Sequence, residues 1–318
     1  MRNQLQIGHN MVAAADTDRG APVPFHDASP AGGSTSRPLI GICTDSNSQL
    51  PAELAQRYGV EVVPLTVMVD DREYLEGFDL EVDDFYGLYA EGHKPKVEFG
   101  QPSPGQFAAA YDDLIAKGCT QILSIHTSAS VSGTLKAARL AAHSAPVPIR
   151  LIDSRTARFG VSCCVWATAE ALARGATAEQ AAAVAEGMAP EVRTVFTLAG
   201  LDLLHHDTSG AADSHASEAP LHRVSTFVKG HSEVVGEVAS LVEAVNAMAA
   251  YTLRAGRERG GLNVAVGSAH QALLPVADAL TQALSGCGHI NDVVQFRIGP
   301  SVGVESGPGT VGCVFYAP

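Results

Sequence analysis

The sequence predicts an α/β protein of two domains, a parallel-sheet N-terminal α/β domain followed by a two-layer α+β domain. Between residues 39 and 152, short apolar runs alternate with helical patterns, an order typical of a parallel sheet with helices on both faces. After about residue 190 the pattern changes to paired strands mixed with helices, which favours an α+β domain. We therefore expect a disordered extension at 1–37, which is rich in Ala, Asp, Gly, Pro and Ser, and domains at 38–189 and 190–318.

The first domain is expected to contain four strands and a hairpin partner. The strands are predicted at 39–43, 60–69, 122–125 and 149–152, with the partner at 72–75. Helical patterns separate them at 51–58, 82–89, 107–117 and 135–143, and the first of these begins with a proline, as helices often do. Two Ala-rich helices follow at 160–173 and 177–188.

The second domain is expected to mix strands, a hairpin and two helices. Strands are predicted at 194–198, 263–266, 293–298 and 310–316, with a hairpin from 224–228 and 233–238. Helices are predicted at 241–259 and 273–284. Residues 201–204 suggest a helical turn, 205–220 a polar loop, and the glycine-rich run 303–309 a tight turn.

The composition excludes several classes of partner. The chain has 318 residues, of which 46% are hydrophobic and 17% charged, so it can bury a large core. Its net charge of −13 argues against nucleic acids and anionic membranes, which bind basic surfaces. The six cysteines form no C-x-x-C pair, which indicates reduced core residues rather than disulfides or a zinc site.

Neither a membrane span nor a targeting segment is expected. No apolar run reaches the ~18 residues that a membrane helix needs. Residues 1–37 lack the apolar segment of a signal peptide. A cytoplasmic location is therefore the expectation.

The run of small residues at 128–134 is the strongest candidate for a ligand site. It contains Ser128, Ser130, Ser132, Gly133 and Thr134, and it connects a predicted strand to a predicted helix. Backbone N–H groups and the helix dipole at such a turn attract anions. The run holds no Lys or Arg, so we expect hydroxyl groups to hold a weakly charged head group. The same residues also serve as ordinary helix caps, and that alternative stays open.

Two other polar turns are expected at the same edge of the sheet. Thr44, Asp45 and Ser46 follow the first strand, and Asp153, Ser154 and Arg155 follow the fourth. Because ligands bind at the carboxyl ends of parallel strands, the three turns predict a shared site. Helix capping predicts the same residue types.

Catalytic, phosphate-binding and metal-binding motifs are weak. Ser46, Ser128, Ser130 or Ser132 could act as a nucleophile with His126 as base, but no G-x-S-x-G elbow surrounds them, and a structural histidine is the favoured interpretation. No Walker A loop or G-x-G-x-x-G follows a strand. The polar loop contains three histidines and two aspartates without a known ligand spacing, at His205, His206, Asp207, Asp213 and His215. We expect no cofactor and no metal.

The ordered motifs together resemble the DegV family of fatty-acid-binding proteins. The matching segments are Thr-Asp-Ser at 44–46, Val-Val-Pro-Leu at 62–65, Tyr-Leu-Glu-Gly at 74–77, Gln-Pro-Ser-Pro-Gly at 101–105, the hydroxyl run at 128–134, Asp-Ser-Arg at 153–155 and Gly-Pro-Gly at 307–309. The resemblance covers nearly everything from Leu39 onward. It implies two α/β domains with one long-chain fatty acid buried between them, and a binding protein rather than an enzyme.

The resemblance also implies which residues hold the carboxylate. Ser128 matches the serine that contacts it, and Ser46, Ser103, Ser130, Ser132, Gly133 and Thr134 belong to the matching segments. Two positions depart from the family pattern. Phe99 stands where the family has a threonine, and Glu305 where it has a histidine, so Glu305 must be protonated or turned outward in such a site.

Two points about partners follow from the resemblance. Some members present the fatty acid to a separate fatty-acid kinase, but the Gly-Gly-Arg-Ile segment linked to this role is replaced here by residues 205–220. A divergent enzyme, or a binder of another small ligand that uses Glu305 and the hydroxyl run, is the alternative function.

Overall fold

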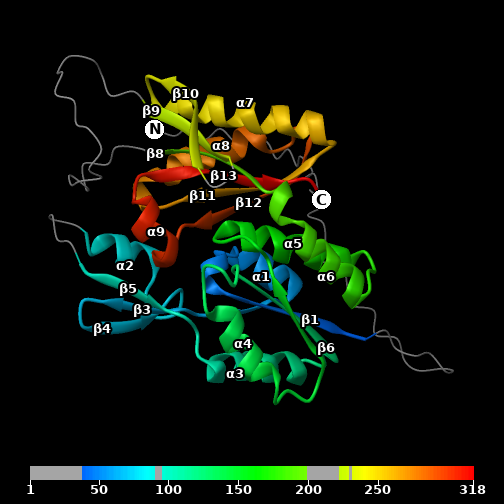
Figure 1. The fold of residues 1–318 in the computed structure, drawn as a ribbon. Coiled ribbons are helices and arrows are strands. Elements are labelled where there is room, and N and C mark those ends of the chain that lie inside the picture. The colour runs from blue at the N-terminus through cyan, green and yellow to red at the C-terminus, as the bar shows by residue number, and fades with distance from the viewer. Residues whose placement is uncertain (1–37, 90–94, 199–221, 229–230) are drawn as a thin grey trace, which may run out of the picture. The chain divides into compact units, whose positions relative to one another are not determined.

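The described part of the chain contains three β-sheets. The fold comes from a computed structural model that describes residues 38–89, 95–198, 222–228 and 231–318 (Figure 1). Residues 38–318 form one compact unit. The combination of a parallel α/β sheet with a separate mixed sheet confirms the predicted fold class. The boundary predicted at residue 190 stays a prediction, and the predicted extension at 1–37 lies outside the described residues.

The four-stranded sheet is parallel throughout, as predicted. Its order is β2-β1-β6-β7. The central strands are almost completely buried, as expected when helices cover both faces of a sheet. The strands are β1 (Ile40–Asp45), β2 (Glu61–Val63), β6 (Gln121–His126) and β7 (Ile149–Asp153).

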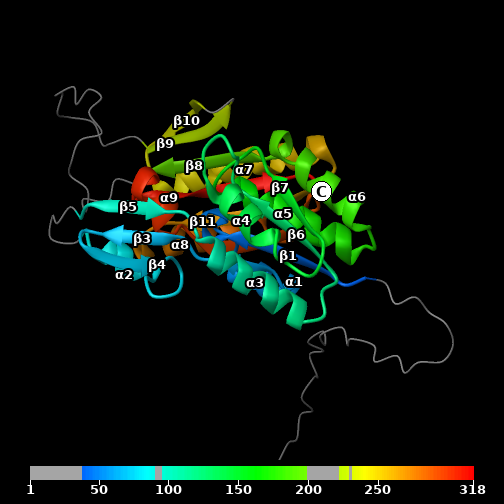
Figure 2. The same cartoon turned by 60° about the horizontal axis from the view of Figure 1, so that its bottom comes forward.

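Helices cover both faces of this sheet (Figures 1 and 2). Neighbouring residues of β1 point to opposite faces, so that Ile42 packs with α5 and α6 while Cys43 packs with α3 and α4. The helices are α1 (Ala52–Tyr58), α3 (Pro104–Ala116), α4 (Thr134–Ala142), α5 (Phe159–Ala173) and α6 (Ala178–Gly187).

Helix α5 is apolar on all sides because it lies between two sheets. Twelve of its 15 residues are buried. One side packs on the parallel sheet, and the other meets the six-stranded sheet, where Trp166 lies edge-on to Tyr316 with ring centroids 5.7 Å apart. Phe159 stacks on Phe296 at 4.2 Å. An all-round apolar helix is the pattern expected of such a central position.

The six-stranded sheet is mixed, with the order β10-β9-β8-β13-β11-β12. The predicted hairpin is confirmed by antiparallel pairing of β9 with β10. Helices α7 and α8 pack on one face through residues such as Met248 and Leu280. The elements are β8 (Arg193–Leu198), β9 (His222–Val228), β10 (His231–Val238), α7 (Leu241–Arg259), β11 (Leu262–Ser268), α8 (Leu274–Leu284), β12 (Ile290–Arg297) and β13 (Thr310–Tyr316).

The single strand predicted at 60–69 is wrong. Pro64 has no N–H to donate, and the chain divides there into β2 and β3 (Thr66–Val69). Strand β3 leaves the parallel sheet and pairs with β4 (Arg72–Leu75) and with β5 (Val97–Gly100), a strand that the sequence pattern did not reveal. Together with α2 (Val82–Gly87), this small sheet builds an apolar cluster that includes Val67, Phe85 and Ile298.

The tight turn predicted at 303–309 is also wrong at its start. Residues Pro300–Ser306 form a helix, α9, and Gly307 ends it with a φ of 79°. Pro300 at the first helical position is the signal for this helix. The predicted features at 201–204 and 205–220 lie outside the described residues. Among the helices that are described, none is long and apolar enough to cross a membrane.

Candidate functional site

The three polar turns meet at one edge of the parallel sheet, as expected from their positions after β1, β6 and β7. The hydroxyl of Thr127 donates to Asn47 Oδ1 at 2.9 Å, which joins the ends of β6 and β1. The N–H of Ser128 donates to the carbonyl of Thr156 at 2.9 Å, which joins the ends of β6 and β7. The neighbouring Ala129 N–H faces Asp153 Oδ2 at 3.4 Å.

Two of the serines in the hydroxyl run are accessible. Ser128 is half-buried, and its hydroxyl lies 2.9 Å from that of the exposed Ser130. The run ends in the first turn of α4, where Ser132 Oγ accepts from the N–H of Thr134 at 3.2 Å. The N-cap of α4 is Gly133, so no side chain caps this helix. Ser132 bonds the backbone just before the helix, whereas the hydroxyls of Ser128 and Ser130 hydrogen-bond each other and can rotate to donate to a ligand.

Two other candidate serines have structural partners. Ser103 is the N-cap of α3 and forms a capping box with Gln106. Ser46 donates to Glu76 Oε2 at 2.6 Å and accepts from the N–H of Leu65 at 2.9 Å. Glu76 is 5% exposed, and it also accepts from the N–H of Ser301 at 2.8 Å. The hydroxyl of Ser46 therefore stabilises a buried carboxylate of the chain itself.

Gly133 and Phe99 lie in different surroundings. A Cβ on Gly133 would be 2.0 Å from Gln101 Oε1, so the Gln-Pro-Ser segment lies against the hydroxyl run. Phe99, on β5, is half-buried and packs beside the apolar cluster that contains Val67 and Ile298. A phenyl ring there contributes apolar surface but offers no hydrogen bond to a carboxylate.

Glu305 is turned outward and forms an ion pair with Arg158. The two side chains are 62% and 46% exposed, and an Nη2 of Arg158 donates to Glu305 Oε2. Outward orientation was one of the two expectations for this residue. Arg158 has a φ of 56° and a ψ of −142°, a strained conformation for a residue with a side chain.

Arg158 is a member of this edge that the sequence analysis missed. Its N–H faces Asn47 Oδ1 at 3.4 Å, the same oxygen that accepts from Thr127. One amide oxygen thus joins the residue before Ser128 to the backbone of Arg158. The absence of Lys and Arg from the run 128–134 does not make the surroundings of the turn free of positive charge.

A buried hydrogen-bond network lies behind the turn. His126 Nδ1 donates to Asp45 Oδ2 at 2.7 Å, and His126 Nε2 lies 2.7 Å from Ser124 Oγ. The phenol of Tyr111 continues the chain at 2.9 Å from Ser124, and burial raises its pKa, so it stays protonated. This order of groups resembles a hydrolase triad, but Ser124, His126 and Asp45 are 0% exposed.

The network has a structural role. No substrate can reach a nucleophile that is fully buried, and the favoured interpretation of His126 as a structural histidine agrees with its position. The serine that contacts it is Ser124, and not one of the four serines weighed as a nucleophile. Ser124 and His126 are two residues apart on β6 and so share a face of the strand, which is the signal that identifies the pair.

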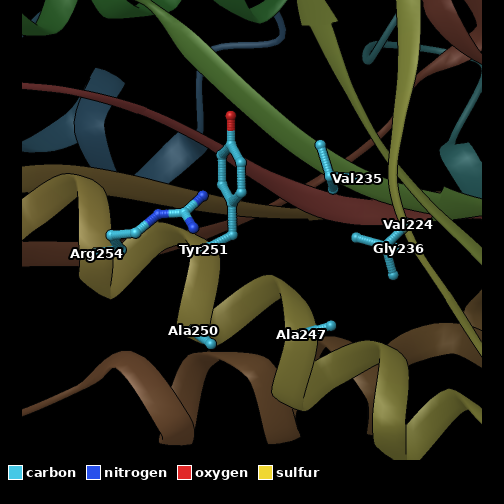
Figure 3. A pocket seen from close by; sticks show the side chains of 7 residues that line it. All are labelled: Val224, Val235, Gly236, Ala247, Ala250, Tyr251 and Arg254. Carbon is cyan, nitrogen blue, oxygen red and sulfur yellow. The ribbon is translucent and has the colours of Figure 1, made fainter.

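A separate surface hollow of about 190 Å³ lies between the β9–β10 hairpin and α7 (Figure 3). Val224, Val235 and Ala247 give it an apolar lining, and the Arg254 guanidinium lies 5.4 Å from the centre of the Tyr251 ring. None of the predicted site residues lines it.

Comparisons with known proteins match almost the whole described chain. The family model described as "Uncharacterised protein, DegV family" matches residues 39–318. A DegV domain-containing protein of Streptomyces coelicolor is 31% identical over 278 residues, which cover 86% of this chain and 97% of that protein.

Solved structures extend the match to three dimensions. A Thermus thermophilus DegV family protein, described by its fatty acid binding, has a TM-score of 0.69 and 26% identity, and the match covers 88% of this chain and 100% of that one. DegV of Bacillus subtilis, described as a fatty acid binding protein, has a TM-score of 0.68 and 21% identity, with 89% and 100% covered. With the family model matched from residue 39 to the last residue, the chain belongs to the DegV family.

Proposed function

We propose that this chain binds one long-chain fatty acid without catalysing a reaction on it. The similarity to the Thermus thermophilus protein over that protein's whole length carries the proposal. In this proposal the carboxylate of the ligand lies at the hydroxyl run, and its hydrocarbon chain is buried in a tunnel between the two domains.

The hydrocarbon chain supplies most of the affinity. Burying ~14 methylene groups at ~0.8 kcal/mol each contributes about 11 kcal/mol before the entropic cost of binding. The head group then needs orientation more than strong attraction. Apolar side chains around Phe99, Val67 and Ile298 offer the surface that such a chain prefers, and they would have to separate to admit it.

Ser128 is the residue we assign to the carboxylate. Its side chain is half-buried at the sheet edge, and its Oγ contacts the rotatable hydroxyl of Ser130 at 2.9 Å and accepts from the N–H of Ser130 at 3.4 Å. Both hydroxyls can therefore donate to a carboxylate at little cost. Ser46, by contrast, is occupied by the buried Glu76, and Ser103 by its own helix.

Transfer of the bound acid to a fatty-acid kinase stays a weaker proposal. The segment of the chain that bears on it, 205–220, lies outside the described residues.

Native mass spectrometry of the purified full chain tests the proposal. We expect a population heavier than the bare polypeptide by the mass of one fatty acid, and extraction with organic solvent should release an acyl species of that mass. Bare protein that also fails to take up added palmitic acid would contradict it.

A further inference from the structure

We infer that Arg158 is the cation that receives the ligand's carboxylate, and that Glu305 occupies Arg158 when no ligand is present. This inference rests on the proposed function and adds a charged group to the hydroxyl site. It makes the ion pair between the two residues an exchangeable contact, in which one carboxylate replaces another on the same guanidinium.

The position of Arg158 supports this role. Asn47 Oδ1 accepts from the hydroxyl of Thr127 and from the N–H of Arg158, so both segments are fixed to one side chain. Two residues before Arg158, the carbonyl of Thr156 accepts from the N–H of Ser128. The backbone of Arg158 therefore lies close to Ser128, the serine to which we assign the carboxylate.

The ion pair itself is of a kind that a ligand can open. Its side chains are 46% and 62% exposed, and water at such exposure weakens an ion pair. Glu305 is the next-to-last residue of α9, and its carboxylate accepts a hydrogen bond from Arg158. A guanidinium pairs equally well with the carboxylate of a fatty acid.

The strained backbone of Arg158 also supports a role in ligand binding. Its φ of 56° is unfavourable for a residue with a Cβ, and the fold keeps it at a sheet edge where three loops meet. Arg150 offers the matching contrast. It forms an exposed ion pair with Glu186 at 2.9 Å, with 43% and 45% exposure, but it lies within β7 and contacts none of the site residues.

The test compares an acid with an uncharged ligand of the same length. Binding of carbon-14-labelled palmitic acid and of hexadecanol is measured by equilibrium dialysis to the delipidated full chain, in wild type, Arg158→Gln, Glu305→Gln and the control Arg150→Gln. We expect Arg158→Gln to lower the affinity for palmitic acid roughly fivefold. Glu305→Gln should raise that affinity about two- to fivefold. Hexadecanol binding and the control variant should stay within twofold of wild type, and salt at about 1 M should reduce both differences.

The outcomes separate this inference from the proposed function. If wild type binds palmitic acid but neither variant changes the ratio of acid to alcohol affinity, the role of Arg158 is wrong and fatty-acid binding stands. If wild type binds neither ligand, both fail. If Arg158→Gln lowers the affinities for acid and alcohol equally, the arginine stabilises the fold and does not bind the carboxylate. This result also overturns the inference.

Discussion

Replacing His126 with leucine should destabilise the protein by about 3–5 kcal/mol. The imidazole makes two hydrogen bonds of 2.7 Å, to Asp45 and to Ser124, and all three side chains are buried. Ser124 keeps the phenol of Tyr111 at 2.9 Å. Among the described residues Asp45 keeps the N–H of Asn47 at 3.2 Å, so a buried carboxylate loses its main partner.

Urea unfolding followed by circular dichroism and by tryptophan fluorescence measures the effect. The midpoint should fall by roughly 1 M or more, with both probes in agreement. The control is His143→Leu, since His143 is exposed and its ring bonds the carbonyl of Arg139, and this change should stay within about 0.5 kcal/mol.

A second variant tests the physical cause. In Asp45→Asn/His126→Leu the unpaired group is a neutral amide rather than a carboxylate, so the double variant should be more stable than His126→Leu by about 1–2 kcal/mol. A double variant as unstable as the single one would refute the argument that an unpaired buried charge causes the loss.

Three further predictions concern packing, a buried acid and the thiols. Gly312→Ala should destabilise the six-stranded sheet by about 1–3 kcal/mol in urea unfolding, because the new Cβ would lie 2.3 Å from the backbone oxygen of Val195; unchanged stability would contradict the close approach. Glu76→Gln should cost about 1–3 kcal/mol in the same assay, because the amide cannot accept every hydrogen bond that the carboxylate accepts, whereas an equal midpoint would show that the buried acid is dispensable. At pH 8 a thiol reagent should modify Cys287 first and the five buried thiols only on unfolding, because burial raises the pKa of Cys164 and Cys313 to about 12 and keeps their thiols protonated; rapid reaction of all six would contradict this.

The parallel sheet could be predicted because its signals are local. Each signal is made by residues that are neighbours in the sequence. These signals are the apolar runs, the proline or serine that begins a helix, and the polar turn after each strand. Helix α7 and strand β13 have the bounds that the pattern predicts. The small sheet could not be predicted in this way, because β5 has four residues and becomes a strand through its pairing with β3, about 30 residues earlier.

The candidate site also has parts that local sequence predicts and parts that depend on distant contacts. The hydroxyl run and its place at the sheet edge follow from neighbouring residues. The ion pair of Arg158 and Glu305 joins positions 147 residues apart, and no sequence period connects them. The sequence analysis expected Glu305 to be protonated or turned outward, but it could not predict that Arg158 is its partner. Similarly, the contact between Ser124 and His126 could have been predicted from the alternation of side chains along one strand. The contact of His126 with Asp45 could not, because it depends on how β1 and β6 pair.

The most direct test of fatty-acid binding at Ser128 is a calorimetric titration of the delipidated chain with palmitic acid. We predict one bound acid per chain, and an affinity about tenfold lower in Ser128→Ala, because one hydrogen bond to the carboxylate is lost. Hexadecanol should bind wild type and Ser128→Ala equally well. Ser285→Ala, which removes an exposed hydroxyl on α8's C-terminal side, should behave as wild type. No saturable binding, or an equal loss for acid and alcohol in Ser128→Ala, would contradict the account.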